Sequence, residues 1–585
     1  MSVVVTRGHR KRWIVYVLGL IVAVPLACFL LLKDWHPDTS KVPSFAAYAN
    51  TEADVLPHWS PDDKTIIYAR GSATGSAVFI VSSKGGTATK LLADAGMPAW
   101  SPDGSQIVFG SDRRTGFHPL SGFGLGRAIN LWASDAAAHQ QHEITNLDAA
   151  CLEPTWSPDG KQIAFTQFPG PRVMAMSVEG GEPRFVAEGI SPAWSPDGKQ
   201  FAYLGNMKGG FMARFRIYIR PAAGGEPRQL RSYALDAEIY HAMPTLDWSP
   251  DSKRLLAIQL VEGRWQPAVI NVEQDAVEQI VPVQGSVAGP RWSHDGKHMV
   301  YSVTDTGHPL RIEVMTPANG RVVDLSSNGE YTAARLVRIR SADGLEIPSW
   351  LYLPHDATQA KHPAIVWLHG TIPGQGGSTQ DIFNPEIQYF VDQGFVVLAP
   401  NYRGSAGFGD ALAKFSTGDN PVPDVTAAAG YLASLDSVDP KRIALLGYSF
   451  GGYLTMRTVV ENPGMFAAAV DYYGPVDLAR LYREDASMRP TLAALLGGTP
   501  DSTPDAYRSA SPINFVDRLN TPVLLLYGTR DPFYGHSVEL AKLLKQKGKS
   551  YEYLTYRFAG HGFRGKDSID ANQQILRFLS GHLRP

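Results

Sequence analysis

The stretch Leu445-Leu446-Gly447-Tyr448-Ser449-Phe450-Gly451-Gly452 lies between two segments of different character. The residues before it, from position 441, form a short apolar run that is typical of a buried strand. The residues after it, up to position 460, carry apolar side chains at helical spacing. A strand, a sharp turn and a helix are the setting in which Gly-x-Ser-x-Gly presents a serine hydroxyl above an α/β sheet. The stretch therefore predicts an α/β-hydrolase domain; the alternative is an ordinary glycine-rich turn.

A serine hydroxyl needs a base to activate it, and the base needs an acid to orient it. The β-like run 521–527 ends in Gly528-Thr529-Arg530-Asp531, which places Asp531 beyond the carboxyl end of a strand. The next candidate strand, 551–556, leads into His561, which has a glycine on each side. We therefore predict Ser449, Asp531 and His561 as a catalytic triad.

Such a triad also needs two backbone N–H groups that hold the oxyanion. One is expected from Phe450, directly after the serine, where a helix N-terminus adds its positive dipole end. The other is expected from Gly370 or Thr371, which follow the candidate strand 362–368. The sequence does not decide between these two.

Five segments of the second half of the chain form a recognisable set: His369-Gly370, Pro400–Ser405, Gly447–Gly452, Gly528–Asp531 and Gly560-His561-Gly562. Through them, the chain from about Leu351 to its C-terminus resembles the catalytic domain of the prolyl oligopeptidase family of serine peptidases, in the style of its acylaminoacyl-peptidase and dipeptidyl-peptidase branches. The chain departs from the acylaminoacyl-peptidase pattern at Thr371, where that branch has a second glycine.

This resemblance also implies a first specificity pocket lined by Phe450, Val476 and Tyr482. Ala479 stands where proline-cleaving dipeptidyl members carry a tryptophan, which implies a wider pocket and argues against strict cleavage after proline. Those members hold the amino terminus of the substrate with a Glu-Glu pair, and this chain has no Glu-Glu. We therefore expect an oligopeptidase or acylaminoacyl-type activity on oligopeptide substrates.

A second pattern fills the first half of the chain. A pentapeptide of the type Trp-Ser-Pro-Asp-Gly occurs six times, and it begins at Trp59, Trp100, Trp156, Trp194, Trp248 and Trp292. The successive spacings are 41, 56, 38, 54 and 44 residues, close to the ~40–50 residues of a propeller blade. Each copy reads as a tight structural turn, because proline presets φ and glycine accepts the strained position.

The repeats predict a β-propeller of six visible blades, with a degenerate seventh near residues 42–54 as the alternative. We interpret the longer spacings as insertions at 113–126 and 232–244. The predicted fold is thus multidomain, with an all-β propeller over 55–330 and an α/β-hydrolase domain over 331–585. Family resemblance implies that the propeller covers the active site and excludes large folded proteins.

The N-terminus predicts a membrane anchor. A basic tail (1–12) precedes an apolar stretch (13–32) that would span ~30 Å as a helix, and 33–54 is a linker. Basic residues on the N-terminal side predict a cytoplasmic N-terminus and a periplasmic or extracellular catalytic domain. A cleaved signal peptide, or a lipoprotein signal at Cys28, is the alternative.

Composition restricts the remaining possibilities. The formal net charge of −2 suggests no nucleic-acid partner, and we find neither metal-ligand spacing nor a phosphate-binding glycine loop, so no cofactor is expected. The two cysteines, Cys28 and Cys151, predict no intrachain disulfide. The oligomeric state stays open. Two other functions remain: an esterase or amidase that uses the same triad, and a propeller-based binding protein whose hydrolase domain is catalytically idle.

Overall fold

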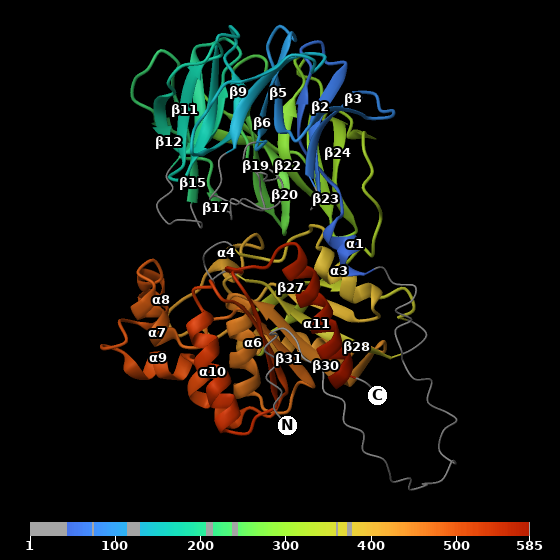
Figure 1. Ribbon diagram of the computed structural model, residues 1–585, viewed down its shortest axis with the longest axis vertical. Helices are drawn as coiled ribbons and strands as arrows, with labels where there is room; N and C mark the ends of the chain where they lie inside the picture. Colours follow the sequence, from blue (N-terminus) through green and yellow to red (C-terminus); the bar gives the residue numbers. More distant parts are fainter. Residues whose placement is uncertain are drawn as a thin grey trace, which may run out of the picture.

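The computed structural model describes residues 44–583, apart from 73–74, 114–128, 206–213, 237–243, 358–360 and 371–376. The predicted basic tail, the predicted membrane anchor at 13–32 and residues 33–43 of the linker lie outside the described residues. In the described part of the chain, no helix combines the length and apolarity needed to cross a membrane. Two bodies are visible in Figure 1, a ring of β-sheets (blue to green) and a mixed α/β body (yellow to red).

Six β-sheets follow one another within the described residues; each has four antiparallel strands in chain order, and one of them has a fifth strand off this path. The blades are β1 (Ala53–Trp59), β2 (Thr65–Ser72), β3 (Gly75–Ser82), β4 (Thr89–Ala93); β5 (Gly96–Trp100), β6 (Gln106–Ser111), β7 (Asn130–Asp135), β8 (Gln141–Glu143); β9 (Ala150–Trp156), β10 (Gln162–Phe168), β11 (Arg172–Ser177), β12 (Arg184–Glu188); β13 (Ile190–Trp194), β14 (Gln200–Gly205), β15 (Arg214–Pro221), β16 (Arg228–Gln229); β18 (Asp247–Trp248), β19 (Arg254–Val261), β20 (Arg264–Asn271), β21 (Ala276–Ile280); β22 (Ser286–Trp292), β23 (Met299–Asp305), β24 (His308–Thr316), β25 (Arg321–Asp324). The short β17 (Leu235–Asp236) pairs with β15. The predicted six-bladed propeller is confirmed, and residues 44–54, offered for a seventh blade, form helix α1 (Phe45–Ala49) and the start of β1.

Every Trp-Ser-Pro-Asp-Gly copy ends the innermost strand of a blade and closes a local hydrogen-bonded turn. In the second copy, Ser101 Oγ donates to Asp103 Oδ1 at 2.6 Å and accepts from Gln106 N–H at 2.9 Å. The fifth position has positive φ throughout, which explains the glycines found there. Asp63 and Ser252 occupy this position in two copies, with φ of 57° and 58°.

Asp63 connects the first blade to the last. Its carboxylate accepts hydrogen bonds from the backbone N–H groups of His294 and Asp295, both at 2.9 Å. Among the described residues, every blade is built from strands that are consecutive in the chain, and no shared strand joins the two ends of the ring. The aspartate at this strained position thus makes one of the contacts between the first blade and the last.

The second body contains one eight-stranded sheet in the order β26-β27-β29-β28-β30-β31-β32-β33. All neighbours from β29 to β33 are parallel. The strands are β26 (Arg335–Arg340), β27 (Glu346–Tyr352), β28 (His362–Leu368), β29 (Val396–Pro400), β30 (Val438–Tyr448), β31 (Ala468–Tyr472), β32 (Val523–Gly528) and β33 (Tyr551–Tyr556). The helices are α3 (Pro385–Asp392), α4 (Asp410–Ala413), α5 (Val422–Ala433), α6 (Phe450–Glu461), α7 (Leu478–Glu484), α8 (Arg489–Leu496), α9 (Pro504–Ala510), α10 (Tyr534–Gln546) and α11 (Lys566–His582), with a 3₁₀ helix at Pro512–Arg518.

Alternating side chains of the strands fill two cores, one on each face of the sheet. On β28, Val366 and Leu368 pack on the face covered by α5, α6 and α10. Ile365 and Trp367 pack on the opposite face, with α1, α3 and α11. Because β28, β29, β31 and β32 are buried on both sides, they are mostly apolar in sequence, whereas the edge strand β33 is not.

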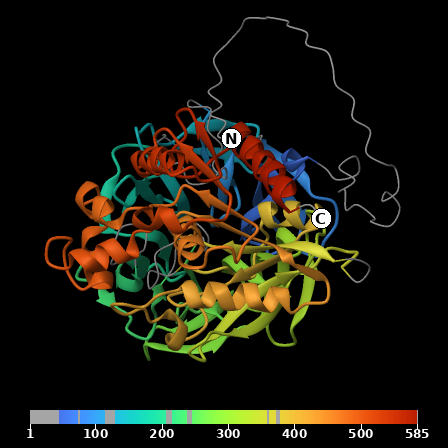
Figure 2. The same ribbon diagram turned by 90° about the horizontal axis from the view of Figure 1, so that it is seen from below.

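The propeller lies over the edge of this sheet at which the parallel strands end (Figure 1). The loop after β29 reaches the β19–β20 turn, where Gly263 N–H donates to Gly407 O at 3.1 Å. Arg264 of the same turn forms a 2.6 Å ion pair with Asp381. From below, the blades extend beyond the α/β body on several sides (Figure 2). Any group at the carboxyl ends of the strands therefore faces the propeller.

Candidate active site

Ser449 occupies a strained turn between β30 and α6. Its φ of 57° and ψ of −122° lie outside the regions that most residues adopt. The glycines on either side allow close backbone approach, because a Cβ on Gly447 would lie 2.2 Å from Gly451 O. A Cβ on Gly451 would lie 2.2 Å from Leu368 O. The sequence thus leaves no room for larger residues at these two positions, and the serine stands out from the sheet edge.

The three predicted triad side chains form one hydrogen-bonded chain. His561 Nε2 lies 2.9 Å from Ser449 Oγ, and His561 Nδ1 lies 2.8 Å from Asp531 Oδ2. Asp531 is buried, and its second oxygen accepts a 2.7 Å hydrogen bond from Phe533 N–H. The geometry fits a carboxylate that orients an imidazole and an imidazole that receives the serine proton.

Aromatic rings hold His561 in this orientation. The ring of Tyr473 meets it edge to face at 4.7 Å, and the ring of Phe533 does so at 5.2 Å. Tyr473 itself has a φ of 51°, an uncommon value for a bulky residue. Sequence reasoning did not identify either ring as part of the site, because neither lies in a catalytic motif.

The predicted oxyanion loop passes next to the serine. A Cβ on Gly370 would lie 3.3 Å from Ser449 Cβ, so the backbone of Gly370 approaches the nucleophile closely. The amide of Phe450 is the first of α6, where backbone N–H groups have no partner within the helix. Thr371 lies outside the described residues.

His369 fixes the position of this loop. Its Nε2 lies 2.9 Å from Ser405 Oγ, and its ring stacks on Tyr402 at 4.3 Å. Tyr402 Oη donates to His369 O at 2.8 Å. The family-like segment Pro400–Ser405 therefore has a structural task here, and its Arg403 is ion-paired with the buried Asp424 at 2.7 Å.

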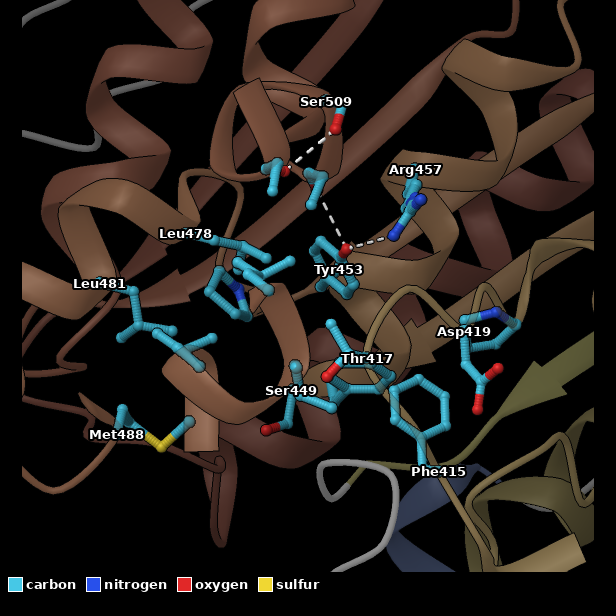
Figure 3. Close-up of a pocket in the computed structure, with 18 of the residues that line it drawn as sticks. Phe415, Thr417, Asp419, Ser449, Tyr453, Arg457, Leu478, Leu481, Met488 and Ser509 are labelled. Atoms are coloured by element: carbon cyan, nitrogen blue, oxygen red, sulfur yellow. Dashed lines mark hydrogen bonds between the residues drawn. The ribbon is translucent and has the colours of Figure 1, made fainter. Parts of the chain in front are cut away.

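A cavity of about 510 Å³ opens beside Ser449 and His561 (Figure 3). Phe450 lines it, whereas Val476, Ala479 and Tyr482, which the family resemblance also suggests for the specificity pocket, are not among the residues that line this cavity. Its apolar wall is instead formed by Phe415, Leu478, Leu481, Met488, Leu492, Leu495 and Leu496.

The rotation of α7 places Ala479 away from the cavity. A helix turns by about 100° per residue, so Leu478 and Leu481 lie on the face toward the cavity and Ala479 lies to the side of it. Val476 is fully buried in the core beside α6. Tyr482 packs edge to face against Tyr507 at 5.8 Å.

One wall of the cavity is polar. Arg457 lies eight residues after Ser449 on α6, or ~12 Å along the helix axis. Its guanidinium donates to Glu461 at 2.8 Å and to Tyr453 Oη at 2.9 Å. Asp419 contributes a carboxylate from the loop before α5 (Figure 3). Within the described residues, no group of three or more His, Cys, Asp or Glu side chains is arranged to hold a metal ion.

Comparison with known proteins gives a consistent assignment. The family model described as the prolyl oligopeptidase family matches residues 382–585. The uncharacterized peptidase YtmA of Bacillus subtilis is 32% identical over 242 residues, which cover 41% of this chain and 89% of YtmA. Dipeptidyl aminopeptidase BIII of Pseudoxanthomonas mexicana is 28% identical over 247 residues, which cover 39% of this chain but 35% of the relative. The chain thus spans about a third of that longer relative.

Solved structures share the whole two-domain fold. An acylaminoacyl peptidase of Pyrococcus horikoshii aligns with a TM-score of 0.73 and 16% identity. The alignment covers 93% of this chain and 98% of the Pyrococcus chain. A puromycin-hydrolyzing peptidase of Mycobacterium tuberculosis aligns with a TM-score of 0.61 and 21% identity, over 92% and 96% of the two chains. At these identities the likeness establishes the fold, a propeller followed by an α/β-hydrolase domain.

Proposed function

The chain belongs to the prolyl oligopeptidase family of serine-type peptidases, and on that premise we propose that it hydrolyses oligopeptides with Ser449 as the nucleophile. The observation that carries the proposal is the continuous hydrogen-bonded chain from Ser449 through His561 to Asp531. The strained turn at Ser449 and the adjacent loop at Gly370 supply the remaining parts of an acyl-transfer site.

The proposed reaction has two stages. Neutral His561 takes the proton of Ser449 as the hydroxyl oxygen attacks the peptide carbonyl, and Asp531 stabilises the imidazolium that forms. The amide of Phe450 and an amide of the Gly370–Thr371 segment hold the oxyanion. His561 then gives its proton to the leaving amine, and the acyl group stays on Ser449. Water, deprotonated by His561, releases the acid in the second stage.

The cavity beside Ser449 supports a preference for a large, uncharged side chain next to the scissile carbonyl. Its wall is mostly leucine, methionine and phenylalanine, and its volume of about 510 Å³ lies well within the range of sites for drug-sized ligands. Arg457 is already neutralised by Glu461, but a guanidinium has five N–H donors and can donate to a further partner. We therefore expect tyrosine, whose hydroxyl can pair with such a donor, to be preferred over phenylalanine and proline.

The propeller supports a restriction on substrate size. It lies over the sheet edge that carries Ser449, and the two bodies are joined by backbone and ion-pair contacts at Gly263 and Arg264. A folded protein would have to displace these contacts, whereas an extended peptide need not. Short or unfolded peptides are therefore the proposed substrates.

The apolar segment 13–32 supports a membrane location for the enzyme, with the catalytic domain outside the cytoplasm. The test is alkaline carbonate extraction of membranes. The full chain should stay in the membrane pellet, and a variant that lacks residues 1–33 should be soluble. Release of the full chain by carbonate would contradict the anchor.

Peptide-library profiling beside short-chain esters tests the activity itself. We expect cleavage of peptides of up to a few tens of residues, mainly after tyrosine and other large uncharged residues, with no cleavage by Ser449→Ala. Brisk ester turnover without peptide cleavage would show that the triad serves an esterase instead.

A further inference from the structure

A second buried carboxyl group, outside the triad, lies beneath the Ser449 turn. Asp471 on β31 is fully buried, and its Oδ1 accepts a 2.8 Å hydrogen bond from Gly474 N–H. The same oxygen lies so close to α6 that a Cβ on Gly452 would come within 2.4 Å of it. The carboxyl group therefore touches both the first turn of α6 and the turn that follows β31.

The oxygen atoms around Asp471 have room for an additional proton. Tyr527 Oη lies 2.7 Å from Asp471 Oδ2 and 2.6 Å from Gly474 O. The tyrosine has one hydroxyl proton, and neither a carbonyl nor an ionised carboxylate has any. Each short contact has a proton of its own only if Asp471 is protonated, so that it donates to Tyr527 Oη and Tyr527 donates to Gly474 O; otherwise the two contacts share one proton.

The electrostatic environment agrees with this proton count. Burial raises the pKa of Asp471 to about 7, the hydrogen bonds from Tyr527 and Gly474 oppose that rise, and the charge of Asp531 adds to it. Tyr527, on the neighbouring β32, and Asp531, on the loop after it, are the titratable groups that act on Asp471. At neutral pH the acid and its ionised form are therefore both populated.

The same group of atoms is joined to the triad by short backbone segments. Ser449 N–H donates to Tyr472 O at 2.9 Å, and the next residue is Tyr473, whose ring supports His561. Gly474 follows in the same turn. On the other side, Tyr527 is four residues before Asp531, on the strand that leads into the loop of Asp531. Short backbone segments thus link Asp471 to the residues that support His561 and to Asp531.

We propose that Asp471 is a positioning residue that acts in its protonated form. Its proton completes the chain Asp471–Tyr527–Gly474, which fixes the turn beneath His561. When the proton is lost, Tyr527 donates to the carboxylate, Gly474 O loses its partner, and the turn loosens. This inference rests on the proposed triad, since it concerns how that triad is held.

The test is the pH dependence of kcat/KM for wild type, Asp471→Asn and Tyr527→Phe between pH 5 and 10. Asparagine keeps the shape of the protonated acid, because its amide donates to Tyr527 at every pH and its oxygen accepts from Gly474. We expect the wild-type rate to fall by about tenfold on the alkaline side, the effect of one lost hydrogen bond. Asp471→Asn should match wild type at pH 6 and lack this fall.

Tyr527→Phe keeps the proposal testable if Asp471→Asn does not fold. Without the hydroxyl, Gly474 O has no partner at any pH, so the rate at pH 6 should already be about tenfold lower. An Asp471→Asn enzyme with the wild-type alkaline fall, or a Tyr527→Phe enzyme with the wild-type rate at pH 6, would overturn the proposal. The rate of fluorophosphonate labelling of Ser449 needs no peptide substrate. Its pH profile therefore separates a failure at Asp471 from a failure of the proposed peptidase activity.

Discussion

Asp471→Asn should raise the stability of the catalytic domain at neutral and alkaline pH but not at acid pH. In the folded protein burial raises the pKa of Asp471 to about 7, whereas an unfolded aspartate has a pKa of about 3.9. Between these values the folded state keeps a proton that the unfolded state has released. Wild-type stability therefore decreases as pH rises from about 4 to about 7, and the loss is constant above that range. Asparagine does not ionise and avoids the loss.

The size of the effect follows from the same two pKa values. A difference of about three units at about 1.4 kcal/mol per unit gives at most about 4 kcal/mol above pH 7. For a domain of this length each kcal/mol shifts Tm by about 2–4 °C. The gap between Asp471→Asn and wild type should thus grow from near zero at pH 4 to about 10 °C at pH 8.

Scanning calorimetry of both proteins at matched pH values measures this gap, with the transition of the catalytic domain followed separately from that of the propeller. A Tm difference that does not change between pH 4 and pH 8 would refute the reasoning. It would mean that Asp471 carries the same charge in the folded and unfolded states throughout that range. Wild type more stable than the variant only at alkaline pH would refute it more strongly, because the sign would be reversed.

Three further outcomes are expected at the active site. Asp531→Asn should keep the fold but lower kcat by about 10⁴, because the imidazole of His561 loses its orienting carboxylate. Single-turnover kinetics measures the loss of rate, and a loss below tenfold would contradict the triad. Gly370→Ala should lower kcat by about 10²–10³ with little change in Tm, because the new Cβ at position 370 would lie 3.3 Å from Ser449 Cβ. An unchanged kcat would exclude the loop at Gly370 from the oxyanion site. The double variant Arg457→Met/Glu461→Gln should reduce the ratio of kcat/KM for tyrosine substrates to kcat/KM for phenylalanine substrates by about tenfold. The control variant Ser509→Ala should leave this ratio unchanged, because the Ser509 hydroxyl already donates to the backbone. Equal ratios in wild type, the double variant and Ser509→Ala would exclude Arg457 from specificity.

The parts of this protein that sequence predicted well are those encoded by short local motifs. The six tryptophan pentapeptides end the inner strands of six blades. Each pentapeptide specifies its own turn, because the serine at its second position donates a hydrogen bond to the aspartate at its fourth position. Ser449 and Asp531 could be identified because each follows a continuous apolar strand of the parallel sheet, and His561 because it follows the last strand and has a glycine on each side.

The parts that sequence did not predict depend on contacts between distant segments. The pocket wall depends on the rotation of α7 and on the packing of α8, and neither is fixed by the residues near Tyr473. Asp471 reads in sequence as an ordinary residue at the end of a strand. Its importance becomes visible only when Tyr527, 56 residues later, is placed against it. Asp63 likewise looks like a substituted glycine until the last blade lies beside the first.

Covalent labelling by a fluorophosphonate, read by peptide mass spectrometry, tests the central claim most directly, because the probe reacts only with an activated serine. We predict one modified residue, Ser449, in the wild-type protein, and no labelling of Ser449→Ala or of His561→Ala under the same conditions. Labelling at a different residue, or undiminished labelling of Ser449→Ala, would contradict the assignment of the nucleophile and with it the proposed mechanism.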